Sequence, residues 1–73
     1  MAKPIVQIMG EVYRTDTIAV IVRADNLVDE EFGFAVRQCY ERREDAEAYG
    51  FDSEQARDTA MAQAIANWLE GLA

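Results

Sequence analysis

Carboxylates are the chemically active side chains that this sequence supplies in number. Of its 73 residues, 14 are Asp or Glu and 7 are Lys or Arg, which gives a formal net charge of −7 at pH 7. Carboxylates serve proteins as general acids and bases, as calcium ligands, or as negative surfaces that attract basic partners. Here they form two groups along the chain, first Asp25, Asp29, Glu30 and Glu31, and then Glu44, Asp45, Glu47, Asp52, Glu54 and Asp58.

The first two uses fail on residue type and spacing. Neighbouring carboxylates such as Glu30 and Glu31 point to opposite sides of an extended chain, and a domain of this size is too small to enclose a substrate. Residues 25–31 lack the alternating oxygen ligands and the central glycine of an EF-hand loop. The sequence has no histidine, one cysteine and one serine, and its four glycines form no phosphate-binding motif. We therefore expect no enzymatic activity, no metal site and no cofactor.

The third use, a negative surface that engages a basic partner, fits the placement of the charges. Residues 1–24 have a net charge of +1 and residues 25–73 a net charge of −8. Such a surface repels nucleic acid and attracts basic proteins, so we expect a protein partner with a basic, nucleic-acid-binding site and no direct binding to nucleic acid. The predicted partner-binding residues are Asp29, Glu30, Glu31, Glu44, Asp45 and Glu47.

The geometry of this surface depends on the fold. The two acidic groups merge into one surface if the loop after residue 22 and the start of the C-terminal helix lie at the same end of the sheet. Three nearby arginines are expected to pair with part of the cluster and to reduce its field: Arg37, Arg42 and Arg43. The alternative interpretation is that the acidic residues only keep the protein soluble.

Three segments have the β-branched, alternating pattern of strands, namely residues 4–14, 18–22 and 32–41. A short polar link between the first two predicts a hairpin, and the third is expected to run antiparallel to the second.

Residues 41–51 leave two alternatives open. Their composition is helix-forming, with Gly50 available as a C-terminal stop. A hairpin tip at 42–45 followed by a fourth strand at 46–51 fits as well, and the unbroken alternation favours the strand.

The C-terminal segment predicts a helix of about 20 residues that starts near Ser53. Asp52 and Gln55 have the spacing of a capping box, with Asp52 as the N-cap. One stripe carries apolar residues at spacings of three and four and is expected to cover a sheet face, with Trp68 in the core: Met61, Ala64, Ile65, Trp68, Leu69 and Leu72. The fold class is therefore α+β, a three- or four-stranded antiparallel β-meander followed by one C-terminal packing helix, in a single domain over 1–73.

One helix covers only one face of a sheet, so the second face is expected to be exposed. We place on it the three tyrosines and three further apolar residues: Tyr13, Tyr40, Tyr49, Met9, Ile21 and Phe51. Large exposed apolar patches mark interfaces, so the alternative function is a small structural or assembly module that homodimerises through this face. Cys39 is expected to be a small buried or half-buried residue.

The remaining sequence features concern location and resemblance. No apolar run approaches the roughly 20 residues that span a bilayer, and residues 4–9 are too short for a secretory signal, so a cytoplasmic protein is expected.

In size, charge and expected architecture the chain resembles the small acidic inhibitor proteins encoded by phages, anti-CRISPR proteins among them. The resemblance rests on no shared motif and carries over no functional residue. It implies a stoichiometric binder that blocks a nucleic-acid-handling complex, either by occupying its DNA-binding surface, as the DNA mimic that the charge pattern suggests would do, or by locking its conformation.

Overall fold

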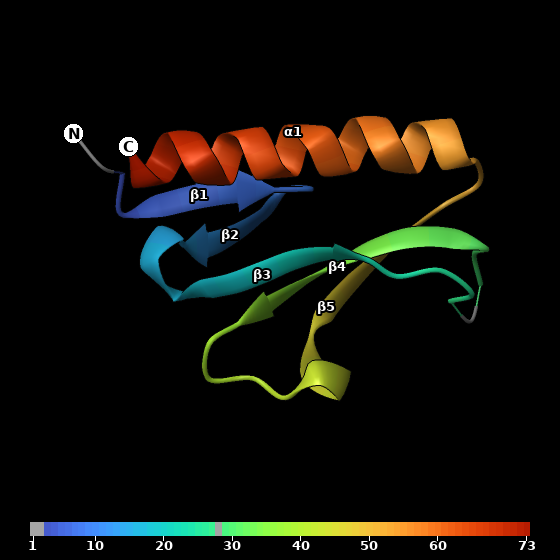
Figure 1. The fold of residues 1–73 in the computed structure, drawn as a ribbon, viewed down its shortest axis with the longest axis horizontal. Helices are drawn as coiled ribbons and strands as arrows, with labels where there is room; N and C mark the ends of the chain where they lie inside the picture. The colour runs from blue at the N-terminus through green and yellow to red at the C-terminus, as the bar shows by residue number, and fades with distance from the viewer. Residues whose placement is uncertain (1–2, 28) are drawn as a thin grey trace.

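The computed structural model describes residues 3–27 and 29–73 and confirms the α+β class, with antiparallel strands followed by one C-terminal helix (Figure 1). The five strands form two sheets rather than one meander: a two-stranded sheet β1-β2 and a three-stranded sheet β3-β4-β5. In chain order the elements are β1 (Ile5–Ile8), β2 (Glu11–Arg14), the 3-10 turn η1 (Thr15–Thr17), β3 (Ile18–Arg23), β4 (Phe32–Gln38), the 3-10 turn η2 (Arg43–Asp45), β5 (Glu47–Phe51) and α1 (Glu54–Leu72).

The segment 4–14 is a hairpin, and the prediction of one continuous strand there is wrong. Met9 and Gly10 both have positive φ, 55° and 81°, and they form a two-residue turn that pairs Ile8 with Glu11. Positive φ at both central residues is the geometry of a type I′ turn, whose twist matches that of the flanking strands. The sequence pattern does not reveal this turn, because Gly10 fits the alternation of an uninterrupted strand.

The predicted hairpin between residues 4–14 and 18–22 does not form. η1 occupies the polar link and turns the chain, so that β3 joins the other sheet, where it pairs antiparallel with β4 as predicted. The strand alternative for residues 46–51 is confirmed, because β5 pairs antiparallel with β4 from Val36–Glu47 to Phe32–Phe51.

The hydrophobic core lies between the hairpin, the three-stranded sheet and α1, which contacts β1, β3, β4 and β5 (Figure 1). Phe34 and Val36 of β4 are fully buried at its centre. The residues expected on an exposed second face are mostly part of this core, so that prediction is wrong: Tyr13 and Ile21 are buried, and Tyr49 and Phe51 pack against them. The reason is that the hairpin and the three-stranded sheet both turn these faces toward α1.

Two of the predicted exposed residues are indeed exposed. Tyr40 is 71% exposed and Met9 is 50% exposed, both in turns at strand ends. Tyr13 and Tyr49 instead share a hydrogen bond between their hydroxyls, which links the hairpin to β5. Burial and this hydrogen bond raise the pKa of Tyr13 well above its ordinary value, and burial is the main cause that raises the pKa of Tyr49.

The helix begins at Glu54, with Ser53 rather than Asp52 as its N-cap. The Ser53 Oγ accepts a hydrogen bond from the backbone N–H of Ala56 at 3.1 Å. The predicted stripe meets the core as far as Trp68, whose indole N–H donates to the Thr15 carbonyl at 3.3 Å. Its last two members, Leu69 and Leu72, are about half exposed.

In the last turn of α1, Gly71 and not a leucine packs against the rest of the protein. Gly71 is buried, and a Cβ placed there would lie 2.9 Å from the Thr15 Cγ2. Glycine therefore permits η1 to approach the helix closely. The buried positions 57, 64 and 71 are seven residues apart and therefore lie along one face of α1, and Leu69 and Leu72 lie away from the centre of that face.

Candidate functional site

A buried arginine organises one end of the molecule. Arg57, in the first turns of α1, is 1% exposed. Its Nε donates to the Asp58 carboxylate at 2.6 Å, and its Nη1 donates to the Asp25 carboxylate at 2.6 Å and to the Gly33 carbonyl at 3.3 Å. The guanidinium also lies 6.0 Å from the centre of the Phe32 ring, within the range of a cation–π contact.

These contacts fix both the charge and the position of Arg57. The hydrogen bond that Arg57 donates to Asp58 is the largest cause that raises the pKa of Arg57, and the hydrogen bond that it donates to Asp25 acts in the same direction, against the cost of burial. The side chain therefore stays protonated and joins three separate segments, which are the loop after β3, the start of β4 and the start of α1. The sequence interpretation did not single out Arg57. Its spacing of seven residues from Ala64 was the available signal.

The loop after β3 packs closely against the sheet at two glycines. Gly33 of β4 and Gly50 of β5 are cross-strand partners. A Cβ at Gly33 would lie 2.6 Å from the Leu27 Cδ1, and a Cβ at Gly50 would lie 2.6 Å from the Glu30 Cγ. The pair thus forms a hollow in the sheet that receives the side chains of Leu27 and Glu30. This role could not be predicted from the sequence, because the pattern of residues does not reveal which loop packs against a glycine in a strand.

Backbone hydrogen bonds complete the attachment of the loop. The Ala24 N–H donates to the Gly33 carbonyl at 2.9 Å, and the Asn26 N–H donates to the Glu31 carbonyl at 2.8 Å. Asn26 has a φ of 60°, a left-handed conformation that asparagine tolerates better than most residues. The first of these hydrogen bonds extends the pairing of β3 and β4 into the loop, and the second joins two residues of the loop to each other.

The result is one strongly negative region, which we call the acidic end. The first acidic group of the sequence and part of the second lie together at this end of the sheet. Asp25 and Asp58 bind the same arginine, and Glu30 lies against Gly50 near the start of α1. Besides these carboxylates it contains Arg57, which is buried, and Arg23, which pairs with Asp25 at 3.3 Å. The acidic end consists of Asp25, Asp29, Glu30, Glu31, Asp52, Glu54 and Asp58.

The six predicted partner-binding residues do not all lie in this region. Asp29 and Glu31 are exposed and Glu30 is half-buried at the acidic end, whereas Glu44, Asp45 and Glu47 lie on η2 and the start of β5. These two sets flank opposite ends of β4, a strand of seven residues, which corresponds to about 20 Å at about 3.3 Å per residue. The fold thus separates the two halves of the prediction.

The expected pairing of arginines with the acidic cluster is wrong for the part of the chain that the structure describes. Among residues 3–27 and 29–73, no carboxylate lies within 4.0 Å of the guanidinium nitrogens of Arg37, Arg42 or Arg43. Arg37 instead donates to the backbone carbonyl of Glu41 at 3.2 Å. The acidic end is consequently not neutralised by these three side chains.

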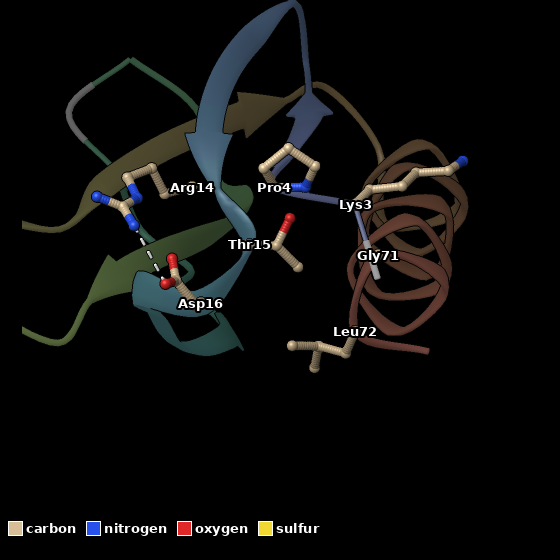
Figure 2. A pocket seen from close by; sticks show the side chains of 7 residues that line it. All are labelled: Lys3, Pro4, Arg14, Thr15, Asp16, Gly71 and Leu72. Carbon is tan, nitrogen blue, oxygen red and sulfur yellow. Dashed lines mark hydrogen bonds and ion pairs between the residues drawn. The ribbon is translucent and has the colours of Figure 1, made fainter. Parts of the chain in front are cut away.

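A small depression lies at the opposite end of α1, where η1 meets the last helical turn. It has a volume of about 270 Å³, and Figure 2 shows it between Lys3, Pro4, Thr15 and Leu72. Thr15 is 3% exposed, and its hydroxyl has no hydrogen-bond partner among the described residues. The two cations at the rim are already engaged, since Lys3 pairs with Glu70 at 3.1 Å and Arg14 with Asp16 at 3.2 Å.

Three further observations concern metal ligands, the single cysteine and the apolar character of α1. Within residues 3–27 and 29–73, no three His, Cys, Asp or Glu side chains are grouped so as to hold a metal ion. Cys39 is exposed, so its predicted burial is wrong, because it lies in the turn after β4 and not inside the strand. The helix that the structure describes is not apolar enough over its length to cross a membrane.

Comparison with known proteins adds no assignment to this geometry. No protein-family model, no curated protein and no solved structure matches the chain.

Proposed function

We propose that the protein is a non-enzymatic binding protein whose acidic end engages a basic, nucleic-acid-binding site on a partner protein. The observation that supports this most is the buried Arg57, which draws the loop after β3 and the start of α1 together through Asp25 and Asp58. Seven carboxylates thereby share one end of the molecule with two arginines, of which one is buried.

The contacts that hold the loop at this end favour recognition over a purely solubilising role. A solvated charged surface needs no fixed loop, whereas here the loop is held by Arg57 and by the Gly33–Gly50 hollow. Pre-organised charges lose little conformational entropy on binding and therefore contribute more to affinity. A partner that normally binds phosphates presents arginines and lysines, which the carboxylates of the acidic end would contact in place of DNA.

This mode of binding corresponds to the class that the sequence resembles. A stoichiometric inhibitor of a nucleic-acid-handling complex, of the anti-CRISPR kind, would occupy the DNA-binding surface of its target. We place such an inhibitor in the cytoplasm, where its target would be, and we assign it no cofactor and no direct nucleic-acid ligand.

The test is capture from a lysate of the native host with three forms of the protein. The first is wild type, and the second is Asp29→Lys/Glu31→Lys/Asp52→Lys, which reverses exposed residues of the acidic end. The matched control is Glu44→Lys/Asp45→Lys/Glu47→Lys, which makes the same change in net charge at the other end of β4.

We expect wild type and the control to retain one nucleic-acid-binding protein that elutes as salt rises and is displaced by duplex DNA. The acidic-end variant should retain none of it. Equal loss in both variants would mean that only net charge matters, and capture that DNA does not displace would contradict mimicry. Circular dichroism of each variant checks that it is folded.

A second candidate function, self-assembly, is favoured by the outer face of the hairpin. Ile5 and Val12 lie on this face and Met9 at its tip, and each is at least half exposed. This apolar surface replaces the sheet face that the sequence led us to expect as the dimer interface. Sedimentation at about 100 μM, well above a typical micromolar dissociation constant, tests it, and a strictly monomeric protein would count against it.

A further inference from the structure

The outer face of the three-stranded sheet carries a groove that is unlike the acidic end in both shape and charge. Val20 pairs with Arg37 and Val22 with Ala35 across β3 and β4, while Ile21, between the two valines, is buried on the opposite face. Side chains alternate along a strand, so these two pairs point away from α1.

The groove has a volume of about 650 Å³, an aliphatic floor and a basic rim. Val20, Val22 and Ala35 form the floor on the two strands. Leu27 and Glu30 of the loop occupy the neighbouring part of the same face, above Gly33 and Gly50, and η2 lies at the other end. The lining residues are Val20, Val22, Arg23, Ala24, Ala35, Arg37, Arg43 and Ala46.

The rim concentrates positive charge on a chain in which acids outnumber bases two to one. Three of its seven basic residues line this groove, and none of the acidic residues that the structure describes does. Arg37 and Arg43 have no carboxylate within 4.0 Å among the described residues, and Arg37 uses one Nη for the Glu41 carbonyl. Most of their guanidinium donors therefore remain available to a ligand.

We infer that this groove binds a segment of a partner protein that combines apolar side chains with Asp or Glu. The aliphatic floor matches apolar side chains, and the two unpaired guanidinium groups match carboxylates, which they bind with two parallel hydrogen bonds. This surface goes beyond the proposed function, because its charge and its ligand are opposite to those of the acidic end.

Two other occupants fit the groove less well. A second copy related by two-fold symmetry would place the three rim arginines opposite three identical ones, at an electrostatic cost. Nucleic acid would find no aromatic side chain among the lining residues on which to stack a base, and it would meet the net charge of −7.

The test is fluorescence anisotropy with a labelled synthetic peptide in which leucine and glutamate alternate. Three forms of the full chain are compared: wild type, Arg37→Gln/Arg43→Gln, and the matched control Arg14→Gln/Arg42→Gln, which removes the same charge outside the groove. A peptide with lysine in place of glutamate and a single-stranded oligonucleotide serve as competing probes.

We expect wild type and the control to bind the acidic peptide with a Kd on the order of 100 μM, as befits a short interface. The Arg37→Gln/Arg43→Gln variant should bind about tenfold more weakly, and the lysine peptide should not bind. Absence of binding by wild type at about 1 mM, equal loss in the control, or tighter groove-dependent binding of the oligonucleotide would each overturn the inference. The acidic-end variant Asp29→Lys/Glu31→Lys/Asp52→Lys should retain peptide binding, which separates this result from the fate of the proposed function.

Discussion

Replacing Thr15 by valine should stabilise the protein. The Thr15 hydroxyl is buried at the junction of η1 and α1 and has no hydrogen-bond partner among the described residues. Burying a hydroxyl without a partner costs about 1–3 kcal/mol, and valine fills almost the same volume without that cost. Taking the lower end, we expect the free energy of unfolding to rise by about 1 kcal/mol, which raises Tm by about 4–8 °C in a domain of this size.

Thermal and urea unfolding, followed by circular dichroism, measure this effect, and an unchanged m-value shows that the stability itself changed. The matched control is Thr15→Ser, which keeps the hydroxyl and removes the Cγ2 that lies against Gly71. The control should lose about 1 kcal/mol for the buried methyl group. A valine variant that is less stable than wild type, with a serine variant that is unchanged, would refute the reasoning and would show that the hydroxyl has a partner in solution.

Three further predictions concern a turn, a close approach and a buried hydrogen bond. Met9→Asn should raise the free energy of unfolding by about 0.5–1 kcal/mol in urea unfolding, because Asn-Gly is preferred in a type I′ turn and Met9 is half exposed; a loss of stability would contradict that turn. Gly33→Ala should cost at least about 2 kcal/mol in the same assay, because its Cβ would lie 2.6 Å from the Tyr49 carbonyl and 2.8 Å from the Ala24 carbonyl, and a neutral result would show that the loop is not seated there. The pKa of both Tyr13 and Tyr49 is raised in the folded state, so their contribution to stability is fully present below a pH of about 10 and is lost as pH rises further. Tyrosinate absorbance and unfolding measured above a pH of about 10 should show this loss. Replacing both tyrosines by phenylalanine should reduce the loss.

The sequence predicts the fold class and the helix because both rest on strong local patterns. The spacing of Met61, Ala64, Ile65 and Trp68 identifies the packed face of α1, and alternation through residue 51 identifies β5. The sheet organisation could not be predicted in the same way. Whether Gly10 continues a strand or closes a turn depends on the φ that the rest of the fold imposes, and one turn at this position changes which strands pair.

The candidate site was only half predictable for a similar reason. Composition and charge indicate that acidic residues gather in the second part of the chain, but they do not reveal which of them share an end of the sheet. That depends on long-range contacts such as the one between Arg57 and Asp25, 32 residues apart, and on the cross-strand pair of Gly33 and Gly50. The basic groove was missed because Arg37 and Arg43 were expected to pair with nearby acids, whereas strand alternation turns Arg37 to the outer face.

The central claim is that the acidic end, and not net charge alone, recognises a basic partner. The most direct measurement is the Kd of the captured partner for the two charge-reversed variants by calorimetry at several salt concentrations. We predict that Asp29→Lys/Glu31→Lys/Asp52→Lys binds about 100-fold more weakly than wild type and loses most of the salt dependence, since three lost charge contacts of up to about 1 kcal/mol each amount to about 3 kcal/mol. Glu44→Lys/Asp45→Lys/Glu47→Lys should stay within about threefold of wild type, which is less than 1 kcal/mol. Equal affinities for the two variants would contradict the claim.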